Sequence, residues 1–264
     1  MSGDAILHAG TATLALELGG LRILTDPAFD PAGREYRVGA DAITRNFRYS
    51  NLAGSALPVK EVGPVDLLLL SHDQHDDNLD VEGRAILEDA KLVLTTRAAQ
   101  KRLKKAVTAL QPFESTTVDL PSGKRLKITA TPARHGPPMS EWLVGEVIGF
   151  VLEVDDGRPP IYISGDTVLF GGIEEVARRF KIGTAILHVG AATFSALGLS
   201  VRFTMDGPEA AKAAKILGAP KVIPIHYAGW SHFRAGRREI EDAFVKEGIA
   251  DRLKWLPLGE RVPL

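Results

Sequence analysis

Residues 65–80 read V-D-L-L-L-L-S-H-D-Q-H-D-D-N-L-D, an apolar run followed at once by two histidines and four aspartates. The apolar run is typical of a buried strand. Imidazoles and carboxylates crowded together are costly, because like charges repel and burial removes their hydration. A divalent cation relieves both costs, so residues 72–77 predict a metal site at the end of a buried strand.

The other candidate ligands follow further strand-like runs. Each of these residues ends or follows a short apolar run: His8, His135, Asp166, His188 and His226. Strand ends at one edge of a sheet converge in space, and polar residues grouped there usually line a site. Taken singly, each is more often a hydrogen-bonded structural residue than a ligand. His232, in W-S-H-F, is equally compatible with an ordinary loop residue.

The composition limits the class of protein. The 264 residues, 45% of them hydrophobic, suffice for a sizeable core, and we expect a single domain over residues 1–264. The 32 basic and 33 acidic side chains nearly balance, so we expect neither a nucleic-acid nor a membrane partner. There is no cysteine, so any metal is held by histidine, carboxylate or carbonyl. The start, M-S-G-D-A-I-L-H, lacks the basic head and apolar core of a signal peptide, and we expect a cytoplasmic protein.

The order of predicted elements places sheets at the centre and helices outside. Residues up to 26 read as short strands, and strands alternate with helices after residue 64. Residues 96–107 predict a helix capped by Thr96, and residues 206–218 predict a helix with an acidic start and a glycine stop. Residues 27–64 predict a long ordered loop beside the active site, in which Arg45, Arg48 and Tyr49 are candidates to cover it. Arg48 would suit a carboxylate or phosphate of a substrate, although a plain surface charge is the commoner role.

The order of these motifs resembles that of the metallo-β-lactamase-fold hydrolases, and the resemblance extends over nearly the whole chain. Within that family, the sequence is similar to the branch of the ascorbate-6-phosphate lactonases. The segments that carry the resemblance are H-A-G-T-A-T-L-A-L-E-L-G-G-L-R-I-L-T-D-P, V-D-L-L-L-L-S-H-D, T-P-A-R-H, Y-I-S-G-D-T and V-I-P-I-H-Y. The resemblance implies an α+β fold, a four-layer αββα sandwich with two central mixed sheets and the metal site at one edge.

The same resemblance implies a ligand set. His72 and His135 match histidines of the first metal, Asp166 matches the carboxylate that bridges two metals, and His226 matches the late histidine of the second.

The metal motif itself departs from the family's usual His-x-His-x-Asp-His. Without a gap, His72, Gln74, Asp76 and Asp77 take the four places. With one inserted residue, His72, His75, Asp77 and Asn78 take them. We favour the second alignment because it keeps two histidines, the better ligands for zinc, and it makes Asp77 the metal aspartate.

The favoured function is a metal-dependent hydrolase acting on an ester, lactone, amide or phosphoester of a small molecule, and an anionic substrate is one option. The metal would lower the pKa of a bound water to about 7. Asp77 would orient or deprotonate that water, and His188 or His232 would donate a proton or grip an anion. One or two divalent ions are expected, with zinc favoured over manganese or iron, and His188 is a candidate for the missing ligand. A metal-binding sensor or scaffold is the alternative, and a homo-oligomer is compatible with the sequence.

Overall fold

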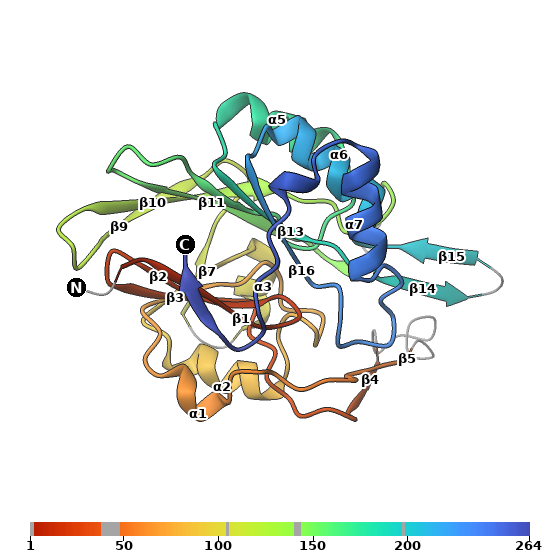
Figure 1. Ribbon diagram of the computed structural model, residues 1–264. Helices are drawn as coiled ribbons and strands as arrows, with labels where there is room; N and C mark the ends of the chain where they lie inside the picture. Colours follow the sequence, from red (N-terminus) through yellow and green to blue (C-terminus); the bar gives the residue numbers. More distant parts are fainter. Residues whose placement is uncertain (1–2, 38–47, 104–105, 140–143, 197–198) are drawn as a thin grey trace.

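Two mixed β-sheets lie face to face at the centre of the molecule (Figure 1). The computed structural model describes residues 3–37, 48–103, 106–139, 144–196 and 199–264. In spatial order, the first sheet contains β17 (Arg261–Pro263), β1 (Ala5–Gly10), β2 (Thr13–Leu18), β3 (Leu21–Thr25), β6 (Leu67–Leu69), β7 (Leu92–Thr95) and β8 (Thr108–Ala109). The second contains β16 (Lys221–Ile225), β13 (Thr184–His188), β12 (Ile161–Ile163), β11 (Ile148–Val154), β10 (Arg125–Pro132) and β9 (Ser115–Asp119).

The main core fills the space between the sheets. In β2, Leu14, Leu16 and Leu18 point inward and are fully buried, while Ala15 and Glu17 alternate with them on the outer face. The opposite sheet contributes large buried side chains, among them Phe150 of β11, to the same cluster. Strands β12, β13 and β16 run parallel to one another, and β3, β6, β7 and β8 do the same in the first sheet. Their carboxyl ends are where the predicted ligands emerge.

Helices cover the outer faces of both sheets (Figure 1). Against the second sheet lie α5 (Gly171–Arg179), α6 (Gly207–Leu217) and α7 (Arg237–Lys246). The apolar sides of these helices form one buried cluster with the side chains on the outer face of that sheet. Against the first lie α1 (Val59–Val62) and α2 (Val81–Asp89). The αββα sandwich predicted from the sequence is confirmed. No helix in the described part of the chain combines the length and apolar character that a membrane crossing requires.

Two of the expected helices differ in how well their limits were predicted. Helix α6 has the predicted ends, because the side chain of Asp206 accepts a hydrogen bond from the backbone of Glu209 and Gly218 closes it at φ 63°. Helix α3 (Arg97–Arg102) begins at the predicted Thr96 cap but ends within two turns, and residues 104–105 lie outside the described part. The short 3-10 helix η2 (Ala250–Arg252) follows α7.

Two small hairpins lie beside the sandwich. Residues 27–64 are not loop throughout: they hold β4 (Glu35–Arg37), β5 (Arg48–Ser50) and α1. The second hairpin joins β14 (Thr193–Ala196) to β15 (Leu199–Arg202). Both hairpins extend from the same end of the molecule (Figure 1). They meet where the rings of Tyr49 and Phe194 lie edge to face, 5.7 Å apart. Arg45 lies outside the described residues.

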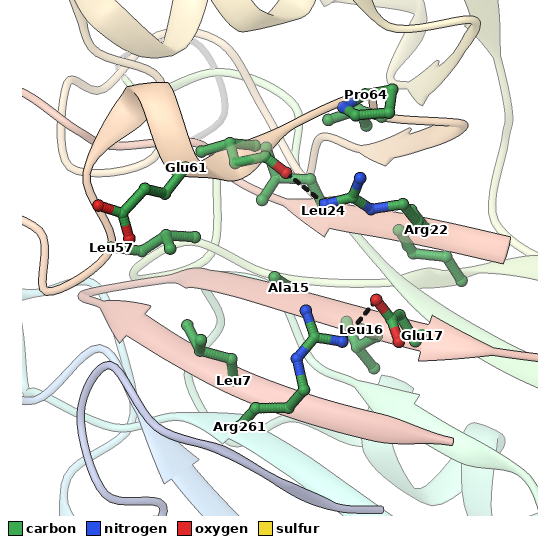
Figure 2. A pocket seen from close by; sticks show the side chains of 13 residues that line it. Leu7, Ala15, Leu16, Glu17, Arg22, Leu24, Leu57, Glu61, Pro64 and Arg261 are labelled. Carbon is green, nitrogen blue, oxygen red and sulfur yellow. Dashed lines mark hydrogen bonds and ion pairs between the residues drawn. The ribbon is translucent and has the colours of Figure 1, made fainter. Parts of the chain in front are cut away.

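A small hollow of about 40 Å³ lies on the outer face of the first sheet beside α1 (Figure 2). Arg22 crosses it to donate a hydrogen bond to the carbonyl of Val62 at 2.7 Å, and Arg261 pairs with Glu17. Both guanidinium groups are thus engaged within the fold. No histidine is among its described lining residues, so the hollow is separate from the predicted metal site.

Candidate metal centre

The predicted ligands meet at one edge of the two sheets. The loop after β6 carries the decapeptide, and His135 follows β10. In the second sheet Asp166 follows β12, His188 ends β13, and His226 follows β16. Because β12, β13 and β16 are parallel neighbours, their carboxyl ends bring these last three residues side by side.

The first group consists of His72, His75, His135 and Asp166, whose ligand atoms all lie within 4.8 Å of one another. His75 Nδ1 is 3.0 Å from His72 Nε2 and 3.1 Å from His135 Nε2. Asp166 Oδ2 is 3.9 Å from His135 Nε2. Three imidazole nitrogens and one carboxylate oxygen converging on one point are the donor set of a tetrahedral zinc site.

The ring orientations in this group suit a metal. A carbonyl can only accept, so the 3.0 Å contact of His135 Nδ1 with the Phe203 carbonyl places the proton on Nδ1 and turns the Nε2 lone pair inward. Burial lowers the pKa of His135 to about 4. Burial, and then the neighbouring His75, lower the pKa of His72 well below its usual value. The neutral imidazole is the form that binds a metal ion.

The second group consists of Asp166, His188 and His226, again with ligand atoms within 4.8 Å. Asp166 Oδ1 is 2.8 Å from His188 Nδ1 and 3.6 Å from His226 Nε2. The two rings stack at 18° with centroids 5.4 Å apart. Asp166 therefore belongs to both groups, as a carboxylate between two ions would. The position of His188 beside Asp166 and His226 is compatible with its predicted role as the replacement ligand, which stays a prediction.

Asp77 lies beside the second group. Its Oδ2 is 3.2 Å from His226 Nε2 and 3.0 Å from His232 Nε2. Burial alone would raise the pKa of Asp77, but hydrogen bonds from these two histidines hold it well below its usual value. Burial alone would lower the pKa of His226, but Asp166 and Asp77 raise it overall. The buried carboxylates of Asp166 and Asp77 thus favour a positive charge next to His226. A divalent cation would supply such a charge.

The residues on which the two alignments of the motif differ lie in different surroundings. The side-chain amide of Gln74 packs on Gly145, where an added Cβ would lie 1.5 Å from its Nε2. Asp76 accepts a hydrogen bond from Tyr49 at 3.0 Å. His75 belongs to the first group, which is compatible with the alignment that has one inserted residue, and that alignment stays a prediction. Asn78 is fully buried, and neither of its amide atoms has a hydrogen-bond partner within the described structure.

The start of the metal loop is held by a buried carboxylic acid. Asp26 Oδ1 accepts the backbone N–H of Ser71 at 2.7 Å, and Ser71 Oγ lies 2.9 Å from His72 Nδ1. Burial raises the pKa of Asp26 well above its usual value. Asp26 of the L-T-D-P turn therefore helps to fix the position of His72, because Ser71 contacts both residues.

Aromatic side chains line a small cavity beside the site. The cavity of about 10 Å³, close to the space that one water molecule needs, is bounded by site histidines and aspartates together with Tyr49, Ala192, Phe194 and Phe203. Phe194 stacks on His232 at 12° with centroids 5.0 Å apart. Of these four residues, only Tyr49 was predicted from the sequence to lie near the site. The others are ordinary apolar residues far from it in the chain, and no local motif marks them.

Arg48 does not line this cavity. Its guanidinium group pairs with Glu35 across the β4–β5 hairpin, and both side chains are more than half exposed. Its position therefore fits the commoner role of a plain surface charge and does not support a grip on an anionic substrate. Among the described residues that bound the cavity, none is arginine or lysine.

Comparison with known proteins agrees with this geometry. Residues 21–227 match the family model described as a β-lactamase superfamily domain. A UPF0173 metal-dependent hydrolase of Pyrococcus horikoshii is 30% identical over 200 residues, covering 74% of this chain and 80% of the relative. One from Thermococcus onnurineus is 29% identical over 225 residues, covering 84% and 90%. The solved isothiocyanate hydrolase from Delia radicum gut bacteria shares the fold, with a TM-score of 0.78 at 22% identity over 98% of both chains.

These relatives are named for metal-dependent hydrolysis, and the narrower likeness to the lactonase-like branch stays a prediction. The matched residues, 21–227, include the clustered ligands from the decapeptide to His226. The chain therefore belongs to the metallo-β-lactamase superfamily, and it is a metal-dependent hydrolase.

Proposed function

We propose that the enzyme holds two zinc ions and hydrolyses an ester, lactone, amide or phosphoester bond of a small molecule. The observation that carries the proposal is the position of Asp166, which offers one oxygen to a three-histidine group and the other to His188 and His226. Imidazole-rich sites favour zinc over manganese, and iron is the main competitor for this donor set.

The roles of the residues follow from their contacts. A bound zinc ion makes a water molecule more acidic and polarises the oxygen of the scissile group. Asp77, ionised and buried beside the second group, is placed to orient the attacking water. His232 bounds the open side of the cavity with its Nε2 directed at Asp77, so it is placed to pass a proton to the leaving group. His188 serves as a ligand in this proposal, while the predicted acid role passes to His232.

The side chains that line the cavity favour a substrate with an uncharged group, either planar or apolar, in contact with the aromatic rings. Phe194, Phe203 and Tyr49 present ring surface to this side, and the described lining offers no cationic side chain for a carboxylate or phosphate. We therefore favour an uncharged group against these rings over the anionic option that the sequence left open. The cytoplasmic location, the lack of nucleic-acid and membrane partners, and the homo-oligomer stay predictions.

Metal analysis and a substrate panel test the proposal together. The protein is purified without added metal, its metal content is measured by inductively coupled plasma mass spectrometry, and paired aryl and carboxylate-bearing esters, lactones and phosphodiesters are assayed. We expect two ions per chain, preference for the aryl member, and loss of turnover in His72→Ala.

Phe194→Ala is the companion variant. It should raise KM for aryl substrates more than it lowers kcat, and leave the metal content unchanged. Tight metal binding without turnover of any panel member would instead favour the sensor or scaffold alternative.

A further inference from the structure

The turn between β1 and β2 reaches across to the second metal group. The carbonyl of Thr11 accepts two hydrogen bonds, one from the backbone N–H of His226 at 2.8 Å and one from Nε2 of His8 at 3.1 Å. The side chain of Thr11 accepts a third, from Nε1 of Trp230 at 2.9 Å. One residue of the turn therefore joins the first strand to the segment that carries the late metal histidine.

Both ends of this connection have unusual backbone conformations. Thr11 has φ 49° and His226 has φ 60°, in the left-handed region that residues with a side chain enter at a cost. A conformation of this kind persists only where the surroundings hold it. For His226, the bond from its N–H to the Thr11 carbonyl is such a restraint, and it fixes the direction in which the imidazole leaves the chain.

His8 in turn fixes the carbonyl. It is 4% exposed, and a carbonyl can only accept, so the ring proton lies on Nε2 and points at Thr11. Its backbone is held on both sides, because it pairs with Leu14 in β2 and its carbonyl accepts from the N–H of Gly259. His8 is absent from both groups of converging ligand atoms.

We infer that His8 is a positioning residue for the second metal group: through the Thr11 carbonyl, it holds His226 in the orientation that offers Nε2 to the ion. The inference rests on the proposed two-metal function. Outer partners that orient a metal ligand typically change metal affinity by about 10- to 100-fold.

Two substitutions separate the hydrogen bond from simple packing. In His8→Gln the side-chain amide nitrogen stands where Nε2 stands, so it can still donate to Thr11. In His8→Asn the amide is one methylene shorter and falls short of the carbonyl. Leu7→Ala is the matched control, because Leu7 is equally buried in β1 but packs on the opposite face. Each protein is stripped with a chelator and titrated with zinc, and the two affinities are measured.

A second readout needs no metal. In the stripped protein, the backbone amide resonance of His226 and the indole resonance of Trp230, one of three tryptophans, report on Thr11 directly. The indole resonance is assigned with Trp230→Phe.

We expect His8→Asn to weaken the second zinc site about 10- to 100-fold with the first unchanged, and to shift both resonances, while His8→Gln and Leu7→Ala resemble the wild type. Wild-type affinity in His8→Asn, or equal loss in His8→Gln, overturns the inference. If the wild type takes up only one ion, the proposed two-metal function is refuted, but this result does not test the role of His8. The resonances then decide the inference, and unshifted signals in His8→Asn overturn it.

Discussion

Replacing His8 with glutamine should change how the stability of the metal-free protein depends on pH. Burial, with smaller contributions from His188 and His226, lowers the pKa of His8 from 6.5 to about 4. Below pH 6.5 the unfolded chain therefore binds a proton at this position that the folded chain does not bind until about pH 4. The wild type loses stability from this group as the pH falls through that window, whereas glutamine does not titrate.

The two pKa values set the size of the effect. At pH 5 the unfolded histidine is almost fully protonated and the folded one is almost fully neutral, which amounts to about 2 kcal/mol against folding. At pH 8 both states are neutral and the contribution vanishes. The difference in unfolding free energy between His8→Gln and the wild type should therefore shift by about 2 kcal/mol in favour of glutamine between pH 8 and pH 5.

Urea unfolding followed by circular dichroism, with chelator present, measures this difference at both pH values. The other buried histidines titrate in both proteins, so their contributions largely cancel. Leu7→Ala neither adds nor removes a titrating group. Its difference in unfolding free energy from the wild type should therefore be the same at pH 8 and pH 5. If the His8→Gln difference stays constant between the two pH values, the buried neutral state assigned to His8 is wrong.

Three further predictions concern the metals. Asp166→Asn should reduce the uptake of both ions and lower kcat by more than about 100-fold, because this residue belongs to both ligand groups; retention of two ions by mass spectrometry would contradict its shared position. Chelation should lower Tm by roughly 8–16 °C in differential scanning calorimetry if the ion stands near 1,000 times its Kd, and added zinc should restore it. His75→Ala should lose the first ion, whereas Gln74→Ala should keep it, since Gln74 packs on Gly145; equal losses would favour the other alignment.

Much of the fold could be predicted because its strongest signals are local. The run V-D-L-L-L-L forms the expected buried strand, and the helix from Gly207 to Leu217 has both of its caps. Five of the seven histidines were identifiable because each ends or follows an apolar run, and strand ends of one sheet meet at one edge; His75 and His232 are the exceptions. In the first group, this rule covers His72, His135 and Asp166, whereas His75 lies inside the loop after the strand.

The remaining features depend on contacts between distant parts of the chain. Tyr49, Phe194 and Trp230 form one aromatic cluster although about 180 residues separate the first from the last, and nothing in the local sequence of Phe194 distinguishes it from a core residue. Strand β17 pairs with β1 across almost the whole chain. The surroundings of Gln74 are equally non-local, because its side-chain amide lies against Gly145, which is distant in the chain.

The two hairpins have a consequence for how such an enzyme can change. The ligands stand on the ends of sheet strands, whereas Tyr49 and Phe194, which face the open side, stand on β4–β5 and β14–β15, outside both sheets. A substitution in either hairpin alters what the cavity admits without moving a strand that carries a ligand. Selection for a new substrate can therefore proceed in small steps, with the hydrolytic machinery inherited intact at each one.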